Sequence, residues 1–217
     1  MRTWIKFCGT TSLADAEASI AAGADAVGFV FTPSKRQVTT EQVRVITQHL
    51  PEEIEKIGVF CDETVENILA TVIVAGLTGA QLHGNEPAGD IARLAEERRG
   101  DRRFCITKTV LIKDSFRDEL QRVLSEVRPP HRVLLDSGSG SGKTFAWDAV
   151  QELVRGSAAH VIVAGGLTPG NVGDAIKTFL PWGVDVASGV EIQAGQKDPQ
   201  KLKAFVDAVR KAENKNG

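Results

Sequence analysis

Short apolar runs alternate with longer amphipathic segments along nearly the whole chain. The runs are rich in β-branched and aromatic residues and have the length of strands. They lie at Trp4–Cys8, Ala26–Phe31, Ile57–Phe60, Ala80–His83, Phe104–Thr109, Val133–Asp136, Val161–Ala164 and Val184–Ala187. A segment with helical spacing of apolar residues follows each run, as at Leu120, Val123, Leu124 and Val127. The pattern therefore predicts eight strand–helix units.

This alternation predicts a parallel sheet covered by helices. Helix starts are marked at Thr39-Thr40, Thr168-Pro169 and Asp198-Pro199, where capping residues or an early proline occur. Eight units in 217 residues favour a closed (β/α)8 TIM barrel, formed by residues 1–217 as a single domain. The alternative fold is an open doubly wound sheet, which more often has roughly five to seven strands.

The charge and cysteine content narrow the class of protein. A net charge of −2 gives no basic surface for nucleic acid and no polybasic patch for a membrane. No apolar run approaches the ~20 residues of a membrane span, and the N-terminal residues have no signal-peptide pattern. The three cysteines, Cys8, Cys61 and Cys105, fit a reducing cytoplasm and have no metal-ligand spacing. Composition leaves a monomer and a homodimer equally open.

Glycine and polar residues collect directly after the predicted strands. Examples are Cys8-Gly9-Thr10, Ser34-Lys35-Arg36, His83-Gly84-Asn85-Glu86 and the stretch from Asp136 to Thr144. In a (β/α)8 barrel these loops form the active site at the C-terminal end of the strands. The pattern therefore predicts a functional site at that end.

Two of these loops are candidates for binding phosphate. Gly165 and Gly166 follow the seventh predicted strand, and Ser188 and Gly189 follow the eighth. Glycine lets backbone N–H groups approach an anion closely, and barrels often hold phosphate after these two strands. Ordinary tight turns are the alternative for either loop alone.

The segment Gly138–Thr144 reads GSGSGKT and resembles a nucleotide-binding P-loop. That motif requires a glycine at the position of Ser137, so the spacing is wrong by one residue. The neighbouring Asp136 would also repel phosphate groups. We therefore expect a loop that closes over the substrate.

Cys8 and Asp136 end the first and sixth predicted strands. Alternation places Cys8 on one face with Trp4 and Lys6. Strands one and six are three positions apart around an eight-stranded ring, so the two side chains would flank a substrate from opposite sides. That arrangement suits an acid–base pair. The alternatives are a small buried cysteine and a carboxylate that anchors a helix or loop.

Four further polar residues are candidates for substrate binding. Arg36 could clamp a carboxylate with two hydrogen bonds, or could be a solvated charge. Gln81 and His83 share a face of the fourth strand, and His83 could be structural instead. Asp185 could be the partner of Lys6 inside the barrel, because the eighth and first strands are neighbours.

Sequence pieces from the first to the eighth strand resemble the phosphoribosylanthranilate isomerase family, in the family's order. They are Lys6–Gly9, Ala22–Phe29, Ser34–Val38, Gly58–Phe60, Gln81–Gly84, Leu134–Asp136, Ala164–Leu167 with Pro169 and Asn171, and Gly183–Glu191. The chain departs from the family at Phe7 and Thr10, where isoleucine is usual, and at Ala187, where serine is usual.

The resemblance implies an Amadori rearrangement of N-(5-phosphoribosyl)anthranilate to 1-(2-carboxyphenylamino)-1-deoxyribulose 5-phosphate. It implies Asp136 as the general acid, Cys8 as the general base and Arg36 as the carboxylate clamp. The backbones of Gly165, Gly166, Ser188 and Gly189 would hold the phosphate. It implies no metal, nucleotide or redox cofactor, because the iminium intermediate is itself the electron sink.

Other phosphosugar barrels are the nearest alternatives. Indole-3-glycerol-phosphate synthase would carry catalytic lysine and glutamate residues at strand ends. The histidine-pathway isomerase would have an aspartate where Cys8 stands. A non-catalytic barrel that binds a phosphorylated ligand would need the glycine loops but not Cys8.

Overall fold

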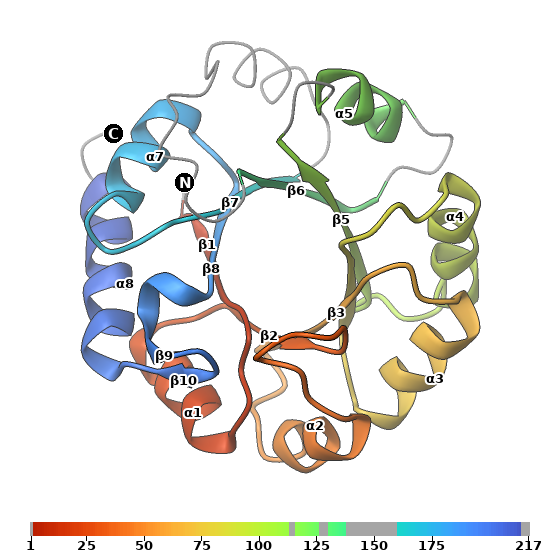
Figure 1. The fold of residues 1–217 in the computed structure, drawn as a ribbon, viewed down its shortest axis with the longest axis horizontal. Helices are drawn as coiled ribbons and strands as arrows, with labels where there is room; N and C mark the ends of the chain where they lie inside the picture. Colours follow the sequence, from red (N-terminus) through yellow and green to blue (C-terminus); the bar gives the residue numbers. More distant parts are fainter. Residues whose placement is uncertain (1, 113–115, 126–129, 138–159, 214–217) are drawn as a thin grey trace.

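The computed structural model describes residues 2–112, 116–125, 130–137 and 160–213. Within them, eight parallel strands follow one another in chain order around a closed barrel (Figure 1). β1 pairs with both β2 and β8, which closes the ring. The strands are β1 (Trp4–Phe7), β2 (Ala26–Val30), β3 (Glu55–Phe60), β4 (Gly79–Leu82), β5 (Cys105–Leu111), β6 (Arg132–Asp136), β7 (His160–Ala164) and β8 (Gly183–Val186). The predicted TIM barrel is confirmed, and the open sheet is excluded.

Helices surround the barrel on its outside (Figure 1). They are α1 (Leu13–Ala22), α2 (Thr40–Thr47), α3 (Val65–Val74), α4 (Ala88–Glu97), α5 (Phe116–Leu124), α7 (Val172–Phe179) and α8 (Pro199–Glu213). The helix expected near residues 145–154 lies outside the described residues, as does the GSGSGKT segment. Among the described residues, no helix is long and apolar enough to cross a membrane.

Two of the three predicted helix starts agree with the structure. Thr39 forms a capping box with Gln42, so α2 begins at Thr40. α8 begins at Pro199, and the Asp198 carboxylate accepts a hydrogen bond from the Gln200 amide at 2.9 Å. The third start was placed too early. α7 begins only at Val172, because the Asn171 side chain holds the preceding turn by accepting from the Thr168 amide.

The alternation predicted for the first strand is also observed. Ile5 and Phe7 face outward and pack among residues of α7 and α8. Lys6 points into the barrel, where its side chain is 1% exposed. Trp4 belongs to a separate interior cluster with residues of β2, β3, β5, β6 and β7. A polar side chain is thus built into the barrel next to the position of Cys8.

The segment after β8 contains elements that the sequence did not predict. A one-turn 3-10 helix, η1 (Ser188–Val190), leads into a hairpin of β9 (Glu191–Gln193) and β10 (Gln196–Lys197). The hairpin lies beside α1 (Figure 1), where the Lys197 amide donates to the Asp15 carboxylate at 2.9 Å. This contact positions buried charges of the hairpin near the end of β1.

Candidate active site

Cys8 and Asp136 lie at the C-terminal ends of β1 and β6. Cys8 directly follows β1, and its amide donates to the Val186 carbonyl at 2.9 Å. Asp136 is the last residue of β6 and is half-buried. The strand order places β1 and β6 three positions apart in the closed ring. The topology therefore agrees with the predicted placement on opposite sides of the barrel mouth.

A glycine on β2 makes room for the Cys8 thiol and the Lys6 ammonium. A Cβ atom added at Gly28 would lie 2.9 Å from Lys6 Cε, 3.1 Å from Lys6 Nζ and 3.0 Å from Cys8 Sγ. The Cys8 thiol and the Lys6 ammonium group therefore both pack against Gly28 of β2. Any larger residue at position 28 would push one of them away.

Opposing effects set the pKa of the Cys8 thiol. Burial raises the pKa, and the Lys6 ammonium lowers it by charge and hydrogen bonding. Asp185 adds to the increase, whereas Lys197 acts with Lys6. Burial prevails, so the pKa is raised above its ordinary value. Lys6 is thus a cationic neighbour that lowers the pKa of the Cys8 thiol, but burial outweighs its effect.

Lys6 is held by the two residues expected to contact substrate on β4 and β8. Its Nζ donates to Gln81 Oε1 at 2.9 Å and to Asp185 Oδ1 at 2.8 Å. The Gln81 amide nitrogen donates to Thr109 Oγ1 at 3.3 Å. The alternative interpretation of Asp185 as the partner of Lys6 is therefore the one observed. Gln81 and Asp185 are both buried and are engaged with Lys6.

His83 presents an unsatisfied ring nitrogen at the mouth. It directly follows β4, and its amide donates to the Phe60 carbonyl at 2.8 Å. Nδ1 is buried and has no hydrogen-bond partner among the described residues. Burial lowers the pKa of the imidazole, opposed by the Asp136 charge. His83 thus has a lowered pKa and one buried ring nitrogen without a partner among the described residues.

The loop after β7 packs closely against the end of β6. Gly165 has φ +89°, and a Cβ atom there would lie 2.6 Å from Asp136 Oδ1 and 2.4 Å from Ser137 Oγ. The Ser137 hydroxyl donates to the Gly165 carbonyl at 3.1 Å. The acid expected on β6 and the glycine loop expected to hold phosphate are therefore in direct contact.

The loops after β7 and β8 touch through their backbones. A Cβ atom at Gly189 would lie only 1.9 Å from the Leu167 carbonyl oxygen, so only glycine fits. The amides of Gly165, Gly166, Ser188 and Gly189 donate no hydrogen bond to another described residue. Unused N–H groups on two adjoining loops are suited to an anion.

Arg36 is engaged by a carboxylate that the sequence analysis did not assign. Arg36 Nε lies 2.9 and 3.1 Å from the two Glu191 oxygens, and Nη2 lies 2.7 Å from Oε2. Glu191 in turn accepts from Lys197 Nζ at 3.1 Å. Lys197 Nζ also donates to the Cys8 carbonyl oxygen. This chain of contacts links the loop after β2 to the hairpin after β8 and to the end of β1.

A second buried ion pair supports the loop after β4 and was also missed. Lys108 Nζ on β5 lies 2.9 Å from Glu86 Oε2 and 2.6 Å from the Gly84 carbonyl oxygen. Glu86 accepts from the amides of Gly84 and Asp62. The only signal in the sequence was a lysine within an apolar strand, which requires a buried partner.

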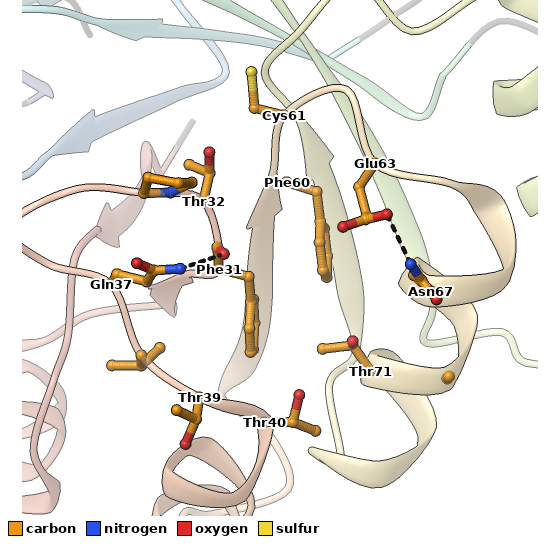
Figure 2. Close-up of a pocket in the computed structure, with 13 residues that line it drawn as sticks. Phe31, Thr32, Gln37, Thr39, Thr40, Phe60, Cys61, Glu63, Asn67 and Thr71 are labelled. Atoms are coloured by element: carbon orange, nitrogen blue, oxygen red, sulfur yellow. Dashed lines mark hydrogen bonds between the residues drawn. The ribbon is translucent and has the colours of Figure 1, made fainter.

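A groove on the outside of the barrel lies away from these residues. It has a volume of about 480 Å³ and runs between α2 and α3, next to the stacked rings of Phe31 and Phe60 (Figure 2). Glu63 and Asn67 form a hydrogen bond at its edge. None of the predicted site residues lines it. Among the described residues, no group of three or more His, Cys, Asp or Glu side chains could hold a metal ion.

Comparison with known protein families gives one match across the barrel. The model of the family described as N-(5'phosphoribosyl)anthranilate (PRA) isomerase matches residues 5–208. A curated relative from Listeria monocytogenes, N-(5'-phosphoribosyl)anthranilate isomerase, is 36% identical over 214 residues, covering 96% of this chain and 99% of that protein. The protein of the same name from Thermotoga neapolitana is 41% identical over 207 residues, covering 93% and 96%.

Solved structures show the same similarity. Phosphoribosyl anthranilate isomerase from Thermotoga maritima is 37% identical, with a TM-score of 0.85 over 96% of this chain and 99% of the other. Another phosphoribosyl anthranilate isomerase structure contains reduced 1-(o-carboxyphenylamino)-1-deoxyribulose 5-phosphate. It is 35% identical, with a TM-score of 0.83 over 96% and 99% of the two chains.

Proposed function

Because the chain belongs to the N-(5'-phosphoribosyl)anthranilate isomerase family, we propose that Cys8 and Asp136 catalyse the family's reaction at the mouth of this barrel. The reaction is the isomerisation of N-(5'-phosphoribosyl)anthranilate in tryptophan biosynthesis. The observation that carries the assignment of roles is the placement of a thiol and a carboxylate at the ends of strands three apart in the ring. An acid and a base on opposite sides of one substrate are what the rearrangement requires.

The first step opens the sugar ring. Asp136 donates a proton to the furanose oxygen while the bond from that oxygen to C1 breaks. The anthranilate nitrogen supplies the electron pair, and a C1 iminium ion forms. Contact between Asp136 and Gly165 places this acid beside the loop assigned to the phosphate.

The second step removes the proton from C2. Cys8 takes that proton as a thiolate, and the C–H electron pair flows into the iminium to give an enolamine. The enolamine then becomes the ketone as its C2 hydroxyl proton passes to the Asp136 carboxylate and the Cys8 thiol gives a proton to C1, which restores both residues. No net atom is gained or lost, and the electron sink is the substrate's own nitrogen.

The raised pKa of Cys8 implies that the substrate contributes to making the base. Ring opening creates a positive charge at the C1 iminium, close to the thiol that must lose its proton. That charge adds to Lys6 and Lys197 and favours the thiolate. Acid catalysis by Asp136 thereby prepares base catalysis by Cys8.

The remaining residues bind or position. Arg36 holds the anthranilate carboxylate, and the amides of Gly165, Gly166, Ser188 and Gly189 hold the phosphate. His83, directly after β4, contacts the opened sugar with its partly exposed ring. Gln81 and Asp185 act on the substrate through Lys6, which they orient.

We also propose an oligomeric state and a cellular compartment for the chain. One solved structure contains monomers generated from the dimeric isomerase of Thermotoga maritima. For this chain, a monomer and a homodimer are the two states that we propose. Three free cysteines support a reducing cytoplasm as its compartment. Light scattering of the purified protein distinguishes the two assemblies.

Growth without tryptophan tests the proposed function. A bacterial strain that lacks its own phosphoribosylanthranilate isomerase should grow without tryptophan when it expresses this chain. The same strain expressing Cys8→Ser should not grow. Failure of the wild-type chain to restore growth, despite soluble expression, would count against the proposal.

A further inference from the structure

One edge of the Arg36 guanidinium group has no partner among the described residues, because Glu191 occupies only the other edge. Glu191 takes Nε and Nη2 with three short contacts of 2.7–3.1 Å. The remaining nitrogen, Nη1, makes no hydrogen bond to any described residue. The Arg36 side chain is 25% exposed, whereas that of Glu191 is 4% exposed. The edge that Glu191 leaves unpaired thus belongs to a partly exposed side chain, whereas its carboxylate partner is buried.

The stem of Arg36 is also constrained. A Cβ atom at Gly9 would lie 2.4 Å from Arg36 Cδ, so the stem crosses the backbone directly after Cys8. Gly9 has φ +76°, a conformation that other residues rarely adopt. Gly9 thus restricts the stem of the Arg36 side chain, and Glu191 holds its guanidinium group.

Glu191 is itself fixed by the hairpin after β8. One of its oxygens accepts from Lys197 Nζ at 3.1 Å and from the Gly195 amide at 3.3 Å. Lys197 has 0% side-chain exposure, and its Nζ also donates to the Cys8 carbonyl. A buried ion pair of this kind contributes little net stability, because desolvation offsets the attraction. However, the ion pair fixes the position of the Glu191 carboxylate, and Glu191 in turn fixes the position of the Arg36 guanidinium group.

We propose that Glu191 is a positioning residue that presents the free edge of Arg36 to the carboxylate of the substrate. Lys197 holds Glu191 in place and ties this clamp to the backbone at Cys8. The bound carboxylate is thereby held in a fixed position relative to Cys8, the proposed base directly after β1. This inference rests on the role proposed above for Arg36.

Two ligands separate positioning from general structural support. The first is reduced 1-(o-carboxyphenylamino)-1-deoxyribulose 5-phosphate, and the second is the same compound without its carboxyl group. We expect the wild-type protein to bind the first at least roughly tenfold more tightly, as a charge-assisted bidentate contact implies. Arg36→Ala should bind the two compounds about equally.

Glu191→Gln keeps the size of the side chain and one acceptor oxygen but removes the charge and the second acceptor. We expect its affinity for the carboxylated compound to fall about fivefold to tenfold, with less than a twofold change for the other. The substrate KM should rise similarly while kcat stays within about threefold. Equal weakening of both compounds, or no change in their ratio, would overturn the proposal.

Glu86→Gln is the matched control, because Glu86 is also a buried carboxylate paired with a lysine near the mouth. It should leave the ratio of the two affinities unchanged. If Glu191→Gln fails to fold, Glu191→Gln/Lys197→Gln removes both charges of the pair and should lose the same preference. If the wild-type protein and Arg36→Ala each bind both compounds equally, then neither the role of Arg36 as the carboxylate clamp nor its positioning by Glu191 holds. The turnover of the wild-type protein tests the isomerase reaction independently of this result.

Discussion

At the scale of single residues, opposing effects of burial and charge act on the pKa of the Cys8 thiol. Burial raises its pKa more than Lys6 and Lys197 lower it. A protonated thiol resists alkylation and oxidation, because the thiolate is the reactive form. A Cys8 thiol with a raised pKa should therefore react slowly with such reagents.

Alkylation of Cys8 by iodoacetamide measures this balance. In a Cys61→Ser background, we expect the midpoint of the rate–pH curve to lie above the ordinary thiol value of about 8.5. Lys6→Met removes the cation that lowers the pKa, so the midpoint should move higher. Cys105, where burial raises the pKa to about 12, should stay unreactive and serves as the internal reference. A wild-type midpoint below about 8 would contradict the account.

Cys8→Ser and Asp136→Asn should each lower kcat by roughly 10²-fold or more, because each removes a proton-transfer group. Steady-state rates on fresh substrate measure the loss. Circular dichroism should show unchanged folds for both variants. Near-normal turnover by either one would remove that residue from the mechanism.

Thr10 carries a structural cost that the family's usual isoleucine avoids. Its hydroxyl is fully buried and has no partner among the described residues. Thr10→Val should therefore raise the free energy of unfolding by about 1–2 kcal/mol. Thr47→Val is the control, since the Thr47 hydroxyl is hydrogen-bonded at 2.7 Å and its loss should destabilise. Urea denaturation compares them, and a less stable Thr10→Val protein would contradict this.

At the scale of elements, a close backbone approach joins the loops after β7 and β8. Gly189 lies against the Leu167 carbonyl, with no space for a methyl group. The two loops can therefore present their amide groups to one anion only while residue 189 is glycine. The strand ends fix where each loop begins, and this contact fixes how the loops meet.

Gly189→Ala should separate these loops and weaken phosphate binding. We expect the inhibition constant of inorganic phosphate and the substrate KM to rise about tenfold, with a smaller effect on kcat. Gly89→Ala is the control, because nothing lies within 4 Å of a Cβ atom there. A Gly189→Ala protein with unchanged phosphate inhibition would argue against these loops as the phosphate site.

The elements were predictable where burial imposes a pattern. All eight strands appear as apolar runs, because the barrel buries both of their faces. β3 begins at Glu55, earlier than predicted, since Glu55 and Lys56 pair with β2 despite their polarity. The hairpin of β9 and β10 was missed for the same reason. Its polar residues show no alternation, and it is held by tertiary contacts such as that between Lys197 and Asp15.

The site was predictable to a similar degree. Cys8, Asp136 and the glycine loops follow strands, so the barrel rules place them. The partners of Arg36 and Lys108 could not be read from the sequence. Glu191 is 155 positions from Arg36, and their contact depends on how the ring closes.

At the scale of the whole molecule, a second polar cluster lies at the N-terminal ends of the strands, opposite the site. The Arg132 guanidinium lies over the rings of both Trp4 and Trp182, at 4.7 and 4.6 Å from their centres, and the two rings stack on each other at 5.1 Å. It also forms two hydrogen bonds of 2.6 and 2.9 Å with Glu55. Barrels generally keep stability at the N-terminal end of the strands and chemistry at the other end. We therefore propose that the single domain divides these tasks between its two ends.

Arg132→Met tests this division. Loss of the stacking and the ion pair should lower the free energy of unfolding by about 1–3 kcal/mol, while kcat/KM stays within about twofold. Arg44→Met is the control, because the exposed pair of Arg44 and Glu41 should contribute less than about 0.5 kcal/mol. A large fall in kcat/KM with unchanged stability would contradict this division, because it would show that the N-terminal end of the barrel affects the reaction at the C-terminal end.

The fluorescence of freshly prepared N-(5'-phosphoribosyl)anthranilate provides the most direct test of the whole account. The purified wild-type chain should consume this substrate catalytically, and the product should be 1-(2-carboxyphenylamino)-1-deoxyribulose 5-phosphate. A well-folded wild-type protein that leaves the substrate unconsumed would contradict the assigned reaction. It would leave a barrel that binds a phosphorylated ligand without transforming it.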